Sequence, residues 1–196
     1  MSNAMFHSTK NAFLSGFLLT ACLIASSVQA AKVAGVELEE SLSIGSHEMT
    51  FNGAGLRKRL FIKLYVGSLY LANASSDASA IIEADEAMSI RINVLSDLLT
   101  RNKMIKALKD GFRKATGGNT AAIRPQIDQM LDSMQEKIRP GDSYTLSYEP
   151  GVGTHIMRGD ETLSTIEGLA FKQALFGIWL SDSPAQASLK KAMLGG

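Results

Sequence analysis

The sequence predicts an α+β domain in which helices lie over an antiparallel sheet. Three observations indicate this fold class: strand-like segments precede residue 72, helical patterns fill residues 100–138, and three short strands precede a very apolar helix at 169–180. Strands and helices segregated along a chain in this way are typical of α+β domains. Because the chain shows no internal repeat or linker, we expect a single domain over residues 31–196.

The residues before that domain carry two processing signals. Residues 1–4 read as an expression-vector scar, and residues 5–30 have the features of a secretory signal peptide. Lys10 precedes an apolar core, and Val28-Gln29-Ala30 forms a small-x-small cleavage site. We therefore predict cleavage after Ala30 and a mature protein in the periplasm or secreted from the cell.

Lipidation is the alternative for this segment, because Leu19-Thr20-Ala21-Cys22 fits the pattern of bacterial lipoproteins. The chain stays apolar after Cys22, where a lipoprotein normally turns polar, so simple cleavage is favoured. Cys22 is the only cysteine, and the mature chain must therefore be stabilised by its hydrophobic core rather than by disulfides.

Composition narrows the class of partner. Lys10 is the only charged residue among residues 1–30, so the mature chain carries 19 basic and 19 acidic residues. A net charge of zero gives no electrostatic reason to expect nucleic acid or an anionic membrane surface as partner. No later segment approaches the roughly 20 apolar residues of a membrane span. We expect a small, partly apolar ligand.

The first half of the domain reads as strands followed by a capped helix. Short strands are predicted at 36–38 and 42–44, and residues 51–56 and 60–72 form a strand pair across a tight basic connection. The second strand of that pair is apolar on both faces, which is typical of a central strand covered on both sides. Ser76 or Asp77 is placed to cap a short helix at residues 78–84.

The second half alternates helices and strands. Met88 to Val94 alternates as a half-buried strand, and Thr100 is placed to cap a helix that runs to Gly117-Gly118. The remaining elements are a helix through Ile127 and Ile138 that ends at Pro140, strands at 143–148, 154–158 and 161–166, and helices at 169–180 and 187–194.

Several kinds of chemistry lack a signal. His47 and His155 are the only mature histidines, and no acidic cluster accompanies them, so we predict no metal site. No nucleophile elbow or phosphate-binding glycine loop is present. We therefore expect no cofactor.

The run Gly53-Ala54-Gly55-Leu56-Arg57, followed by Phe61 to Leu71, resembles the chalcone isomerase family. The segment Phe176 to Pro184 with Leu189-Lys190-Lys191 resembles the bacterial exported branch of that family. The resemblance implies an open-faced β-sandwich, in which a curved antiparallel sheet is backed by helices with a cleft between them. Plant members cyclise chalcones to flavanones, and related plastid proteins bind fatty acids.

Both groups use the arginine of the glycine turn, which matches Arg57. A guanidinium offers a fork of donors to a carboxylate or an enolate-like oxygen, although a basic turn can also be simply solvated. The other catalytic positions depart from the enzyme pattern: in a gapless match they fall on Tyr65, Leu99, Asn102, Lys106 and Ile178. A slip of one residue brings Lys103 to the lysine position but restores no tyrosine. No catalytic residue is therefore assigned.

Arg57 with Tyr65 reproduces the arrangement by which the fatty-acid-binding members hold a carboxylate. We therefore expect a non-catalytic periplasmic protein that binds a small amphipathic ligand, such as a fatty acid, with Phe61, Ile178 and Trp179 lining the cleft. Two alternatives stay open. One is an isomerase or lyase acting on another substrate, with Arg57 as electrophilic stabiliser, and the other is an envelope protein whose cleft is filled by its own side chains. The sequence indicates no oligomeric state.

Overall fold

The computed structural model describes Met1 and residues 31–196. The predicted vector scar, the signal peptide with its cleavage site, and the alternative of lipidation at Cys22 fall on residues outside this range, Met1 excepted. They stay predictions.

A seven-stranded sheet forms the base of the molecule, and consecutive strands pair antiparallel in chain order. Its strands are β3 (Ser41–Ile44), β4 (His47–Arg59), β5 (Ile62–Leu71), β6 (Met88–Val94), β7 (Ser143–Glu149), β8 (Gly153–Arg158) and β9 (Glu161–Ile166). The sheet curves so strongly that the edge strand β3 also contacts β7. Two short strands, β1 (Lys32–Val33) and β2 (Val36–Glu37), form a separate pair.

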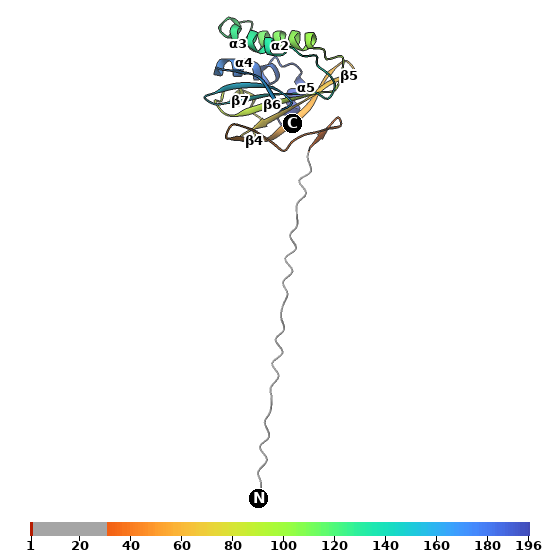
Figure 1. Cartoon of the computed structure of the whole chain (residues 1–196), viewed down its shortest axis with the longest axis vertical. Coiled ribbons are helices and arrows are strands. Elements are labelled where there is room, and N and C mark those ends of the chain that lie inside the picture. Colours follow the sequence, from red (N-terminus) through yellow and green to blue (C-terminus); the bar gives the residue numbers. More distant parts are fainter. Residues whose placement is uncertain (2–30) are drawn as a thin grey trace.

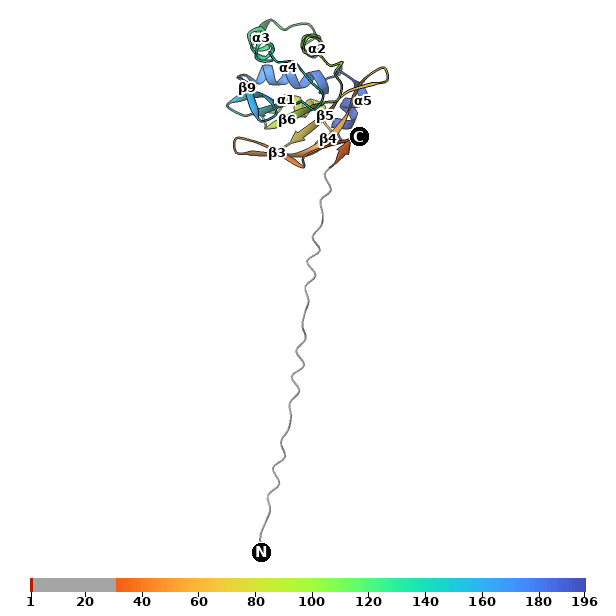
Figure 2. The same cartoon turned by 45° about the vertical axis from the view of Figure 1, so that its right-hand side comes forward.

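The helices cover one face of this sheet in two tiers (Figure 1). They are α1 (Ala78–Glu83), α2 (Arg101–Ala115), the 3₁₀ turn η1 (Ala121–Ile123), α3 (Arg124–Ser133), α4 (Leu169–Leu180) and α5 (Ala187–Met193). The apolar helix α4 lies between the sheet and α2, with which it packs, while α5 packs against β4. Figure 2 shows the same layers from the side, with α2 and α3 outermost. This arrangement confirms the predicted α+β class and the open-faced β-sandwich.

Short-range sequence patterns predicted the position of most helices and strands correctly. The strand at 88–94 and the helix at 169–180 have the predicted bounds. Thr100 caps α2 by accepting a hydrogen bond from the Lys103 amide, and Asp77, rather than Ser76, caps α1. The central strand β5 is buried from Tyr65 to Leu71, as expected for a strand covered on both faces.

The basic turn predicted after Leu56 is wrong. The strand β4 continues through Arg57 and ends at Arg59, and the hairpin turn consists of Leu60 and Phe61. The glycines predicted to form a turn lie inside β4 and serve a close approach instead. A Cβ on Gly53 would lie 2.3 Å from the Ala192 carbonyl oxygen of α5.

The predicted helix through Ile138 is also too long, because α3 ends at Ser133. Met134 and Ile138 are nevertheless buried in the main core. The apolar pattern therefore predicted their burial correctly, although they lie beyond the end of the helix. Among the described helices, none is long and apolar enough to cross a membrane.

A buried lysine joins two of the helices, and no sequence pattern predicted it. Lys172 of α4 is completely buried, and its ammonium donates hydrogen bonds to the carbonyl oxygens of Ile81, Ile82 and Ala84 at 2.6–2.9 Å. Carbonyls at the end of a helix lack intrahelical partners. Lys172 therefore supplies hydrogen bonds to the free carbonyl groups at the end of α1 and joins that helix to α4.

Candidate functional site

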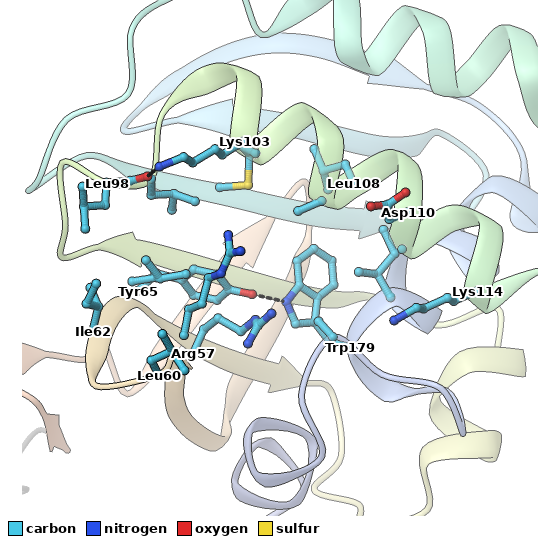
Figure 3. A pocket seen from close by; sticks show the side chains of 18 of the residues that line it. Arg57, Leu60, Ile62, Tyr65, Leu98, Lys103, Leu108, Asp110, Lys114 and Trp179 are labelled. Carbon is cyan, nitrogen blue, oxygen red and sulfur yellow. Dashed lines mark hydrogen bonds between the residues drawn. The ribbon is translucent and has the colours of Figure 1, made fainter.

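A cavity of about 440 Å³ lies where α2, the end of the β4–β5 hairpin and the last turn of α4 meet (Figure 3). Its walls are mostly aliphatic. The lining residues are Arg57, Arg59, Leu60, Ile62, Leu64, Tyr65, Leu98, Leu99, Lys103, Met104, Ala107, Leu108, Asp110, Gly111, Lys114, Ile178, Trp179, Ser183 and Ala185. A cavity of this kind argues against a cleft filled by its own side chains.

A β-bulge brings adjacent residues of β5 to the same cavity. Arg57 pairs with Tyr65 but Lys58 pairs with Lys63, so Leu64 is an extra residue on β5. In a regular strand, neighbouring side chains point to opposite faces, and a bulge re-aims them. Leu64 and Tyr65 therefore both line the cavity.

Tyr65 and Trp179 form a hydrogen-bonded pair in the cavity wall. The indole Nε1 of Trp179 donates to the Tyr65 hydroxyl oxygen at 3.0 Å, and both side chains are buried (Figure 3). Burial raises the pKa of Tyr65 above 10.0, while the Trp179 bond and the Arg57 charge oppose that rise. Tyr65 therefore stays protonated at neutral pH. Since its oxygen accepts from Trp179, its own hydrogen remains available to a ligand.

Arg57 is held beside Tyr65 by contacts on its own side of the sheet. Its Nη1 atom donates to the Gln186 Oε1 atom at 2.9 Å and to the Lys58 carbonyl at 2.7 Å. Gln186 also accepts from the Lys58 amide and donates to the Leu56 carbonyl. Both bonds use the same nitrogen, so the Nη2 and Nε donors of Arg57 form no hydrogen bond within the described part of the chain, and Arg57 lines the cavity.

A second cation approaches from α2. Lys103 lines the cavity, and its Nζ donates to the Leu98 carbonyl at 3.0 Å. Lys106, by contrast, points outward and pairs with Asp110 at 3.1 Å. The structure thus brings to the cavity the lysine that required a slip of one residue in the sequence match.

Four of the five predicted ligand residues line the cavity: Arg57, Tyr65, Ile178 and Trp179. Phe61 does not, and its prediction as a lining residue is wrong. It occupies the turn between β4 and β5 and is fully exposed. The turn begins three residues later than the sequence suggested, so Phe61 lies at the tip of the hairpin rather than within its second strand.

Sequence reasoning missed two residues that shape the site. Gln186 lies 129 residues after Arg57, and no local pattern links them. Gly111 allows α2 to approach α4, because a Cβ there would lie 2.7 Å from Ile178 Cγ2. A glycine inside an otherwise regular helix is the one local signal that was available.

No group of three or more potential metal ligands occurs within residues 31–196. The residues that line the cavity are mainly hydrogen-bond donors and aliphatic side chains, and its one carboxylate, Asp110, pairs with Lys106 and Arg113. Donors of this kind suit an anionic or carbonyl oxygen, and aliphatic walls suit an apolar group.

A model described as chalcone isomerase-like matches residues 30–195. The chain belongs to the chalcone isomerase-like family. The crystal structure of an Arabidopsis thaliana fatty-acid-binding protein superimposes on this chalcone isomerase-like chain with a TM-score of 0.64. The two sequences are 17% identical, and the match covers 82% of this chain and 92% of the other.

At that identity the structural likeness concerns the fold alone. No curated protein matches the sequence. The role of the chalcone isomerase-like domain must therefore be argued from its own cavity.

Proposed function

We propose that this chalcone isomerase-like protein is a non-catalytic periplasmic binding protein for a small amphipathic carboxylate, such as a fatty acid. The observation that carries the proposal is the cavity, in which Arg57 and Tyr65 line the same wall and aliphatic side chains make up about half of the lining. Its volume of about 440 Å³ falls within the usual range for small-molecule sites. The location in the periplasm rests on the signal peptide predicted at residues 5–30.

The electrostatics of the cavity support a carboxylate. Arg57 has N–H donors that remain for a ligand carboxylate, and Tyr65 stays protonated and adds a neutral O–H donor. A charge-assisted hydrogen bond in a partly dry cavity is stronger than one in water. The acyl chain would pack along Leu64, Leu108 and Ile178.

The same residues argue against cyclisation chemistry. General acid–base catalysis needs a titratable group within hydrogen-bond reach of the reacting atoms. The positions of the family's catalytic tyrosine and late hydroxyl fall on Leu99 and Ile178 here, which line the cavity but neither donate nor accept protons. Arg57 and Tyr65 can orient an oxygen, but the tyrosine and the late hydroxyl that complete the family's catalytic set are replaced by apolar residues.

Two measurements test the proposal. The first is native mass spectrometry of protein purified from the periplasm without refolding, with extraction of anything bound and determination of the N-terminus. We expect a fatty acid and an N-terminus at residue 31. An empty protein that also ignores added laurate would contradict the proposal.

The second measurement compares laurate with dodecanol, which has the same chain without the carboxylate. Arg57→Ala should weaken laurate binding about tenfold or more, because a charged hydrogen bond contributes roughly 1.5–3 kcal/mol. Dodecanol binding should change little. Lys58→Ala is the matched control, since Lys58 lies next to Arg57 on the same strand, is exposed and does not line the cavity. Equal losses in both variants would show that Arg57 is not the anchor.

A further inference from the structure

The tip of the β4–β5 hairpin presents three consecutive large apolar side chains to solvent. Leu60 is 85% exposed, Phe61 100% and Ile62 40%, and Leu98 in the adjacent turn is 44% exposed. Within residues 31–196 the one other exposed large hydrophobic residue is Val152. Scattered exposed apolar residues need no explanation, but a cluster of four marks an interaction surface.

Hairpin stability does not explain this composition. The turn has two residues, Leu60 and Phe61, and Leu60 has a φ of 55°. Turns of this length favour asparagine or glycine where φ is positive, because a Cβ is strained there. The tip therefore keeps an apolar side chain at a position where local energetics favour another residue, which points to a role outside the fold.

Beyond Glu48, the charges on the β4–β5 hairpin itself are of one sign. Between Glu48 and Asp77 the sequence has four basic residues, Arg57, Lys58, Arg59 and Lys63, and no acidic residue. Lys58, Arg59 and Lys63 are exposed, and within the described part of the chain none of them forms a salt bridge. The acidic residue nearest in the adjacent turn is Asp97. The net charge of zero thus hides a local cationic surface.

We propose that this hairpin tip docks the protein on an anionic lipid bilayer. Phe61, with Leu60 and Ile62, enters the interface between head groups and acyl chains, while the three exposed cations contact lipid phosphates. Apolar side chains combined with basic neighbours are the features by which peripheral proteins bind anionic membranes. In Figure 2 the β4–β5 hairpin, drawn in orange and yellow, projects clear of the helices, as a segment that enters a lipid surface must.

The position of the cavity favours a bilayer over a protein partner. Leu60, Ile62 and Leu98 are exposed at the tip and also line the cavity. Docking therefore places the cavity mouth against the lipid, where an amphipathic molecule would enter without crossing water. This consequence rests on the proposed function, whereas docking itself does not, because it needs only the exposed side chains.

The test is flotation with vesicles of phosphatidylcholine alone and of equal parts phosphatidylcholine and phosphatidylglycerol. Every variant carries the same N-terminus, checked by intact mass, so that a retained apolar leader cannot account for a difference. We expect binding to the anionic vesicles that falls as salt rises. Phe61→Ser should reduce binding about tenfold, because it removes the largest apolar side chain that the bilayer would bury.

The matched control is Val152→Ser, which removes an exposed apolar residue from the turn between β7 and β8 at the opposite end of the sheet. It should bind like the unmodified protein. Lys58→Ser combined with Lys63→Ser should abolish the preference for anionic vesicles. Leu60→Asn should lose binding while the melting temperature stays the same or rises, because asparagine relieves the positive φ. Unfolding then cannot explain the loss.

Three outcomes would overturn docking: no binding to the anionic vesicles, equal binding by the Phe61 and Val152 variants, or dimers in sedimentation that Phe61→Ser dissociates. The last would assign the tip to a second copy of the chain. Laurate binding by Phe61→Ser is measured alongside and should be unchanged, since Phe61 lies outside the cavity. Failure of docking and failure of the proposed function are thereby distinguished.

Discussion

The indole nitrogen of Trp179 lies 3.0 Å from the Tyr65 hydroxyl, and this hydrogen bond joins α4 to β5 in the wall of the cavity. Both side chains are buried, so each polar atom depends on the other. The bond orients the Tyr65 hydroxyl with its hydrogen free, and it therefore connects the stability of the core to the donor set of the site.

Tyr65→Phe should destabilise the fold by about 1–3 kcal/mol, because it leaves the buried indole N–H without an acceptor. In a double-mutant cycle with Trp179→Phe, the coupling energy should be about 1 kcal/mol. Urea unfolding followed by circular dichroism measures both, since Trp179 is the only tryptophan and its fluorescence is lost in the two variants that lack it. Additive effects would contradict a functional bond between the two.

Gln186 should matter to binding although it lies outside the cavity lining. Its Oε1 atom accepts from Arg57 and from the Lys58 amide. Gln186→Ala frees the guanidinium, so laurate affinity should fall about threefold to tenfold, less than with Arg57→Ala. Calorimetric titration measures the difference. Combining both substitutions should weaken binding no further than Arg57→Ala alone; a larger loss would show that Gln186 acts independently of Arg57.

Gly53→Ala should destabilise the protein by about 1–3 kcal/mol through overpacking. The added Cβ would lie 2.3 Å from the Ala192 carbonyl oxygen and 2.8 Å from that of Met193, so α5 must move away from β4. Gly67→Ala on β5 is the control, because its nearest contact is an ordinary 3.5 Å. Thermal unfolding should separate the two variants by several degrees, and equal melting temperatures would contradict a close approach.

The sequence predicted features that depend on neighbours in the chain and missed those that depend on distant ones. Thr100 was identified as a helix cap because its partner amide lies three residues away. Gly53 was read as part of a turn because the residue that requires it, Ala192, follows 139 positions later. The placement of Arg57 and Tyr65 in one cavity was predictable from the family resemblance, whereas the glutamine that fixes Arg57 was not.

The tyrosines should make the protein sensitive to alkali. Its four tyrosines are Tyr65, Tyr70, Tyr144 and Tyr148, and burial raises the pKa of each above 10.0. For Tyr148, burial together with the hydrogen bond to Asp85 and its charge raises the pKa to about 12. An acid whose pKa is higher in the folded state binds more protons there than in the unfolded chain once the pH exceeds 10.

The protonated tyrosines should therefore contribute fully to the free energy of unfolding below pH 10. This contribution should be lost as the pH rises through the pKa values of the folded state, up to about 12 for Tyr148. Ultraviolet absorbance of tyrosinate measures the titration directly, with protein in concentrated urea as the reference for the unfolded state. The native protein should titrate at higher pH than the reference, with no early phase. A tyrosine that ionises at or below pH 10 in the native protein would show that at least one of the four hydroxyls is open to solvent.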